Sequence, residues 1–361
     1  SFSFFFIKMS VSMKTLVAMG LVVAASAGAS PEEEKLVHKI RSTPGVLWRA
    51  EVGALQGRSL KTLSGVNAES WGAVQKLPKA DSKIADEDIP DEFDSETNWP
   101  KCAKVIGDIR DQSMCGCCWA FAGAEAASDR LCISTGGKVA VPLSAQDVCF
   151  CSSFDGCDGG QIDTPWQYIS STGAVTGGQF EGTYPIGKGG YCSDFTLPHC
   201  HHHGPQGNDP YPAEGAPGCP QQTSPSCPSK CDANATAPHN DFSKDKWTFS
   251  GEVQSASGEE GIQKAIMAGG PVETAFTVYS DFANYVSGIY HHVSGGVEGG
   301  HAVRIVGWGV ENGNKYWKVA NSWNPYWGEN GYFRIKRGNS ECGIEDGVTF
   351  SPHDATWSQG N

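Results

Sequence analysis

The position of the cysteines is the feature that most constrains this chain. All 14 lie between Cys102 and Cys342, and none occurs earlier in the 361 residues. So many cysteines in a chain of ordinary globular composition are typical of a disulfide framework formed in an oxidising compartment. Zinc sites are the alternative, and they would show repeated C-x2-C pairs, which do not recur here. The sequence therefore predicts a disulfide-bonded body that begins near residue 89, after a cysteine-free front piece.

Residues 1–29 have the order of a secretory signal peptide. Lys14 precedes an apolar run at 16–25, and small residues follow, with cleavage expected after Ala27 or Ala29. The run is much shorter than the ~20 residues of a membrane-spanning helix, and no later segment is long and apolar enough to span. Residues 1–8 precede any methionine and could be an untranslated leader. A buried N-terminal helix is the alternative to a signal peptide.

Charge is distributed unevenly along the chain. Residues 1–88 carry 11 Lys and Arg against 9 Asp and Glu, whereas residues 89–361 carry 16 against 31. A basic front piece held partly by charge against an acidic body suits a propeptide released in an acidic compartment; a solvated acidic surface is the other explanation. The net charge of −13 disfavours nucleic acid as a partner.

Helices are predicted in the first half. Pro31 and the glutamates after it stand where the first turn of a short helix within residues 30–60 would be. Residues 78–92 are charged and bounded by prolines, which indicates an exposed linker where processing could occur. The Ala-rich stretch from Cys118 to Cys132 has apolar residues at helical spacing, so we expect Cys118 to begin a helix.

Strands are predicted in the second half. Residues 186–240 are rich in Gly, Pro, His and Cys without periodicity and should form loops fixed by disulfides. From Trp247 onward, short apolar runs alternate with Gly and Asn turns, which indicates an antiparallel sheet or barrel. A helical half followed by a strand half predicts an α+β body with a cleft between its lobes.

Three motifs could together supply a nucleophile and its partners. A thiol at the start of a helix, such as Cys118, lies at the positive end of the macrodipole, which favours thiolate. The backbone N–H of Cys118 and the side-chain amide of Gln112 could stabilise an oxyanion. His301 could act as general base, Asn321 could fix its tautomer, and Trp323 could shield their bond. Each motif alone also fits a structural reading, but their order favours cysteine nucleophilic catalysis.

These motifs resemble the papain family of cysteine proteases. The matching stretches are Asp111 to Phe121, Gly156 to Gly160, the surroundings of His301, and Asn321 to Asn324. More narrowly, residues 30–350 are similar to cathepsin B. That similarity depends on 89–94, Ser280 to Phe282, Trp308 to Asn312 and the Cys-His-His-His segment at 200–203.

The resemblance implies a papain-like two-lobed fold. A helical left lobe and an antiparallel β-barrel right lobe would enclose the active-site cleft. Residues 30–88 would be an inhibitory propeptide and residues 89–361 the peptidase domain. The gaps from Cys118 to His301 and Asn321 are 183 and 203 residues, beyond the family's ≈130–150. An occluding-loop insertion at about 192–231 would account for the excess.

The resemblance also assigns residues to the cleft. Cys118, His301, Asn321 and Gln112 would hydrolyse peptide bonds, while Gly159, Gly160, Trp323 and Gly347 would line the substrate site. A glycine at 347, where mammalian enzymes carry a glutamate, implies a preference for apolar residues at P2, unless Glu345 or Asp346 compensates.

The implied occluding loop would carry His202 and His203. These two histidines would bind a peptide's C-terminal carboxylate, so that dipeptides are released; a metal-binding tract and a solvated histidine run are the alternatives. Asp111 would anchor His202. The family's second ion pair is missing, because residues 201–219 contain no Lys or Arg and Tyr326 occupies the place of its acidic partner. We therefore expect a loop that is easily displaced and appreciable endopeptidase activity.

Disulfide pairing is likewise implied by the family. The pairs would be Cys102–Cys132, Cys115–Cys157, Cys151–Cys227, Cys192–Cys231 and Cys200–Cys219. Cys118 must remain a thiol to act, Cys342 has no assigned partner, and Cys117 and Cys149 could form an extra bridge, although connectivity does not follow from sequence.

The expected molecule is a monomeric precursor in the secretory pathway, destined for a lysosome-like acidic compartment or for the outside of the cell. Its partners would be protein and peptide substrates, its own propeptide and cystatin-type inhibitors, with no cofactor and no metal. Asn234 is a candidate glycosylation site. An inactive homologue used as a binding module and a Cys/His-rich metal-binding protein are the rival functions.

Overall fold

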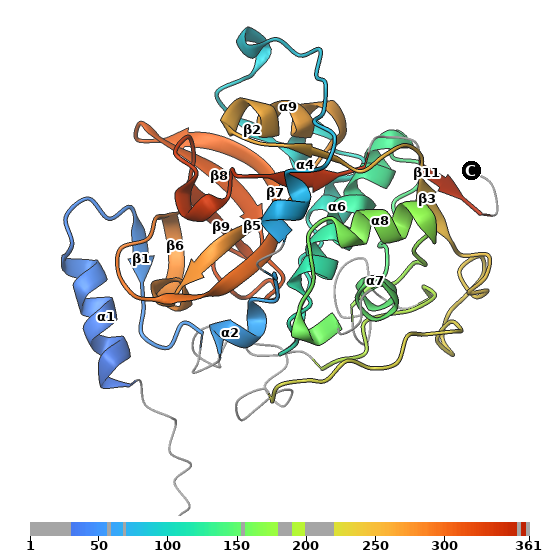
Figure 1. The fold of residues 1–361 in the computed structure, drawn as a ribbon, viewed down its shortest axis with the longest axis horizontal. Helices are drawn as coiled ribbons and strands as arrows, with labels where there is room; N and C mark the ends of the chain where they lie inside the picture. The colour runs from blue at the N-terminus through green and yellow to red at the C-terminus, as the bar shows by residue number, and fades with distance from the viewer. Residues whose placement is uncertain are drawn as a thin grey trace, which may run out of the picture.

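The computed structural model describes residues 30–55, 59–67, 70–152, 156–179, 190–198, 220–351 and 355–358. Helices and strands alternate little along the chain, so two lobes form. In Figure 1, helices α6, α7 and α8 gather on the right and the strands of the large sheet on the left, with α2 low in the view between them. None of the helices in the described ranges is long and apolar enough to cross a bilayer. The helices are α1 Pro31–Ser42, α2 Leu60–Leu63, α3 Ser70–Val74, α4 Ser95–Asn98, α5 Ala103–Ile106, α6 Cys118–Ser134, α7 Ala145–Cys151, α8 Thr164–Ser171 and α9 Glu259–Gly269.

A nine-stranded sheet forms the second lobe. Its strands follow the order β1-β6-β9-β8-β7-β5-β10-β4, and β2 pairs with β7 outside this path, while β3 and β11 form a separate pair. The strands are β1 Trp48–Ala50, β2 Phe93–Asp94, β3 Trp247–Phe249, β4 Gln254–Ala256, β5 Val272–Tyr279, β6 Tyr285–Tyr290, β7 Val297–Glu311, β8 Asn314–Ala320, β9 Tyr332–Lys336, β10 Val348–Phe350 and β11 Ala355–Trp357.

The expected α+β class is confirmed, but the sheet is not the expected antiparallel barrel. Strands β6 and β9 pair in parallel, and the pairings of the described strands form an open path rather than a closed ring. Short apolar runs predict strands without fixing their partners, because pairing direction depends on the connections between them.

Helix α6 forms the centre of the molecule. All residues from Cys118 to Cys132 are buried, and alanine fills most of the positions between the large side chains. A helix that is buried on every side fits the small side chains of this stretch, which allow both lobes to approach it closely. The expected start of the helix at Cys118 is confirmed.

Helix α9 was not expected in the strand-rich half. It begins after Gly258 and buries Ile262, Ala265 and Ile266, which stand at helical spacing. The helical spacing of these apolar residues was not recognised in the sequence, because it covers only about three turns and lies between runs typical of strands.

The front segment (residues 30–88) packs against the sheet lobe. The predicted helix is confirmed as α1, with Ser30 as N-cap accepting a bond from the N–H of Glu33 at 3.1 Å. Strand β1 then pairs antiparallel with β6 and so extends the sheet. Part of the predicted linker pairs as well, because the N–H of Ala80 donates to the carbonyl of Ser255 at 2.9 Å. The front segment is therefore held by backbone pairing at two edges.

Five buried charged groups connect the lobes. Three carboxylates face two guanidiniums: Arg304 of β7 pairs with Asp129 of α6, and Arg110 donates to Asp108 at 2.9 Å, while Glu125 lies 3.7 Å from Arg304 and 3.8 Å from Arg110. Burial raises the pKa of Glu125 to about 7 and that of Asp129 to about 6, although both arginines act in the opposite direction.

This cluster should make the fold less stable at neutral pH than in acid. Folding raises the pKa of Glu125, so the folded chain keeps a proton that the unfolded chain loses. The stabilising contribution is complete below the ordinary value of 4.5 and is lost as the pH rises to about 7. We expect Glu125→Gln to remove on the order of 1–3 kcal/mol of this pH dependence. Urea unfolding at pH 4.5, 6 and 7.5 measures the free energy of unfolding of each variant, and Glu252→Gln, at an exposed position, is the control. Parallel stability curves for wild type and Glu125→Gln would contradict the assignment.

Candidate active site

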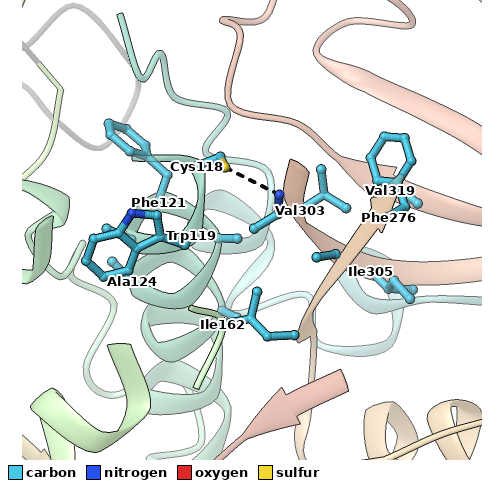
Figure 2. Close-up of a cluster of buried hydrophobic side chains, with 14 of the residues drawn as sticks. Cys118, Trp119, Phe121, Ala124, Ile162, Phe276, Val303, Ile305 and Val319 are labelled. Carbon is cyan, nitrogen blue, oxygen red and sulfur yellow. Dashed lines mark hydrogen bonds between the residues drawn. The ribbon is translucent and has the colours of Figure 1, made fainter. Parts of the chain in front are cut away.

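The sulfur of Cys118 lies where the two lobes meet. Cys118 is the first residue of α6, and its Sγ accepts hydrogen bonds from the backbone N–H of Ala302 in β7 at 3.4 Å and of Gly65 at 3.3 Å. Figure 2 shows this sulfur at the edge of the apolar core, with a dashed line to a backbone nitrogen of β7, while the ring of Trp119 lies on the helix side.

Burial opposes ionisation of this thiol. Desolvation raises the pKa of Cys118 to about 12, although the N–H groups of Ala302 and Gly65 lower it. In this form of the chain, burial therefore opposes the thiolate that the helix end was expected to favour. The physical reason is that the front segment covers the sulfur and excludes the water that would stabilise its charge.

His301 and Asn321 are brought together as expected. His301 is fully buried in β7, and its Nε2 lies 2.7 Å from the Oδ1 of Asn321, which directly follows β8. Because Oδ1 only accepts, Nε2 carries the proton. The ring of Trp323 lies tilted against that of His301, with the ring centres 4.8 Å apart, so it shields the bond on this side. His301 directly precedes Ala302 in the strand that contacts the Cys118 sulfur.

Gln112 presents its amide to the front segment. Its Nε2 donates to the carbonyl of Leu63 at 3.0 Å and to that of Cys115 at 2.8 Å. Its Oε1 accepts from the hydroxyl of Ser322 at 2.7 Å, which fixes which end of the amide faces Leu63. The sequence did not single out Ser322, although it lies between Asn321 and Trp323 within the motif itself.

The front segment runs through the cleft over Cys118. The N–H of Val66 donates to the carbonyl of Gly300 at 2.9 Å, and the N–H of Asn67 donates to Gly160 at 3.0 Å. Gly160 in turn donates to the carbonyl of Gly65 at 2.8 Å. The backbone of the segment thus contacts both walls of the cleft, as a bound peptide would.

Glycines permit this close passage. A Cβ on Gly65 would lie 1.7 Å from the carbonyl oxygen of Gly116, and one on Gly160 would lie 2.4 Å from the ring of Trp119. Gly159 has a φ of +112°, which favours glycine. The two glycines expected to bind substrate, Gly159 and Gly160, therefore lie against the front segment, whereas nothing in the sequence marked Gly65.

Gly347 lies against the front segment. A Cβ on Gly347 would be 2.6 Å from a methyl of Val74 in the front segment. The carboxylate of Glu345 is turned away into its own lobe, where it accepts from Trp317 at 2.9 Å and from the N–H of Ser340 at 2.9 Å. Asp346 is exposed and accepts from the Ser340 hydroxyl at 2.5 Å.

The remaining predicted residues divide between described and masked segments. His202, His203, Cys200 and Cys219 lie outside the described residues. The carboxylate of Asp111, the expected anchor, is buried and accepts from the N–H of Ser113 at 2.7 Å and the amide of Asn324 at 3.2 Å. Asn234 is exposed in a turn. Four expected disulfides are confirmed: Cys102–Cys132, Cys115–Cys157, Cys151–Cys227 and Cys192–Cys231.

Known proteins share this arrangement. The model of the papain family cysteine proteases matches residues 89–351. A cathepsin B-like cysteine proteinase of Schistosoma japonicum is 38% identical over 344 residues, which cover 94% of this chain and 96% of that protein. Cathepsin B-like cysteine proteinase 6 of Caenorhabditis elegans is 44% identical over 289 residues, covering 79% of this chain and 72% of its own length.

Solved structures agree with these relatives. ProCathepsin B S9 from Trypanosoma congolense superposes with a TM-score of 0.72 at 29% identity, covering 89% of this chain and 98% of that one. Digestive procathepsin L 3 of Tenebrio molitor shares the fold, with a TM-score of 0.56 at 21% identity over 89% of this chain and 93% of that one. Both structures are proforms, which accords with a front segment lying in the cleft. The chain belongs to the papain family of cysteine proteases, among the cathepsin B-like members in their precursor form.

Proposed function

We propose that this protein hydrolyses peptide bonds through Cys118, His301, Asn321 and Gln112. The observation that supports it is the convergence of two lobes on one sulfur, beside an amide that already holds a carbonyl oxygen. When the front segment leaves, water returns to Cys118 and the desolvation that raises its pKa is relieved. The N–H of Ala302 and the helix end remain to stabilise a thiolate.

The reaction divides into two acyl transfers. The sulfur attacks the substrate carbonyl, and one Nε2 hydrogen of Gln112, the one that now donates to the carbonyl of Leu63, stabilises the oxyanion that forms. His301 takes the thiol proton and returns it to the leaving amine; water then attacks the thioester, and His301 removes its proton. Asn321 holds the imidazole tautomer, and Ser322 keeps the Gln112 amide from turning over.

Covalent labelling tests the nucleophile. We expect an epoxysuccinyl reagent to add once to the mature wild-type protein and not to Cys118→Ser, whose peptidase activity should fall at least ~1000-fold. Cys342→Ser removes a thiol outside the cleft and should keep both properties. Intact-mass spectrometry reads the label. Labelling that persists in Cys118→Ser would rule out this sulfur as the nucleophile.

Residues 30–88 are proposed as the inhibitory propeptide, with the mature enzyme beginning near Ile89. Gly65 supports this, because its N–H contacts the sulfur and its carbonyl pairs with Gly160. A peptide lying there denies the thiol both solvent and substrate.

Adding one methyl group at Gly65 should therefore weaken inhibition. Its Cβ would overlap the carbonyl of Gly116, so the segment must move off the sulfur. We expect the intact precursor with Gly65→Ala to be alkylated by iodoacetamide at Cys118 at least ~10-fold faster than wild type. Gly72→Ala, where nothing lies within 4 Å of the new Cβ, is the matched control. Equal rates in the two variants would show that the fit at Gly65 does not maintain inhibition.

An apolar P2 preference is proposed from the contact between Val74 and Gly347. Val74 is nearly fully buried there, Glu345 accepts hydrogen bonds within its own lobe, and neighbouring Asp346 is exposed. A guanidinium buried at this position would have no close counter-charge, which is costly.

Introducing a carboxylate at Gly347 should change this preference. Wild type should cleave substrates with Phe at P2 faster than those with Arg, and Gly347→Glu should raise the Arg-to-Phe ratio of kcat/KM at least ~10-fold. Asp346→Asn serves as control and should leave the wild-type ratio nearly unchanged. Arg cleaved as fast as Phe by the wild type would refute the proposal.

Dipeptide release from C-termini is proposed as a second activity, through His202 and His203. Asp111, a buried carboxylate beside the cleft, supports this as the anchor for His202. A carboxylate partner raises a histidine pKa, so loop closure would be lost, and endopeptidase activity would rise, as the pH increases. Passage through the secretory pathway to an acidic compartment or the outside of the cell accords with the four disulfides.

A further inference from the structure

Three sulfur atoms lie together behind the nucleophile. The Sγ atoms of Cys115, Cys117 and Cys149 are all within 4.8 Å of one another, and all three residues are fully buried. Cys115 is bridged to Cys157, whereas Cys117 and Cys149 are thiols in this structure. Neither thiol takes part in the proposed reaction.

The cluster does not suit a metal ion. Structural zinc takes four thiolate or imidazole ligands. One of these three sulfurs is already consumed in a disulfide, and no fourth His, Cys, Asp or Glu joins the group among the residues that the structure describes. The chemistry that remains to two neighbouring thiols is oxidation.

The surrounding chain holds the pair in place. Cys117 is the N-cap of α6 and directly precedes Cys118, while Cys149 lies in α7. A Cβ on Gly156 would be 2.5 Å from the Sγ of Cys149, so the backbone there packs directly on that sulfur. The two sulfurs are thus enclosed where α6 and α7 meet, within 4.8 Å of each other, against about 2 Å in a disulfide.

We propose that Cys117 and Cys149 form a further disulfide when the chain folds in an oxidising compartment. Each thiol loses one hydrogen as the S–S bond forms, and the two electrons and two protons reduce a low-molecular-weight disulfide, such as oxidised glutathione, to two thiols. Because both sulfurs are buried in the folded chain, the exchange occurs before α6 and α7 have packed.

This bridge would act on the nucleophile without touching substrate. It ties the residue before Cys118 to α7 and so restrains the first turn of α6. It also consumes the thiol best placed to attack the neighbouring Cys115–Cys157 bridge, which would otherwise be open to exchange. Cys118 then remains as the sole thiol of the Cys115–Cys118 stretch.

Differential alkylation of the wild-type precursor tests the bridge. Protein secreted without reductant is denatured in mild acid, labelled with light N-ethylmaleimide, reduced, labelled with the heavy reagent, and digested. We expect the heavy label on Cys117 and Cys149, as on bridged Cys132, and the light label on Cys118 and Cys342. Light label on both Cys117 and Cys149 would overturn the proposal.

Counting the alkylatable thiols of variants gives a second measurement, in which the presence or absence of the bridge changes the count in opposite directions. Cys149→Ala should raise the number of alkylatable thiols by one, because Cys117 loses its partner, whereas Cys342→Ser should lower it by one. A decrease of one in Cys149→Ala would show that the two residues are thiols in the secreted protein. The wild-type labelling decides the question by itself if Cys149→Ala does not fold.

Discussion

The contact between the start of α6 and strand β7 at Cys118 is the interaction on which the rest of this molecule depends. The N–H of Ala302 reaches the sulfur from one lobe while the helix presents it from the other. Since His301 precedes Ala302, the same strand brings the imidazole to the site. Any shift of one lobe against the other would separate the sulfur of Cys118 from the imidazole of His301, and the buried charges around Arg304 oppose such a shift.

The front segment lies over the same sulfur and blocks access to it. It supplies an N–H to the sulfur from Gly65 and a carbonyl to Gln112 from Leu63, so it satisfies the polar groups that a reacting peptide would use. Its burial of the thiol also raises the pKa of Cys118, which disfavours the thiolate. Burial of the sulfur by the front segment therefore has two effects: it blocks substrate, and it raises the pKa of the thiol.

Much of the site could be predicted because its residues lie in short, distinctive motifs. The start of a helix at Cys118 followed from local spacing, and the bond of His301 to Asn321 followed from the chemistry that each residue type can perform. Ser322 was missed, since a hydroxyl gives no signal until its neighbour in space is known. Gly65 was missed for the same reason: only its fit against Gly116 makes a side chain there impossible.

The sequence by itself determined the α+β class, the order of the cysteine, histidine and asparagine motifs and, with the family resemblance, four disulfide pairs. These features depend on residue type and spacing, which can be read directly from the sequence. Tertiary structure alone decided that β6 and β9 run in parallel, that burial raises the pKa of Cys118, and that the sulfurs of Cys117 and Cys149 lie within 4.8 Å of each other. Each of these three features depends on which segments, distant in the sequence, lie against a given residue and exclude water from it. The local sequence pattern does not specify those tertiary contacts.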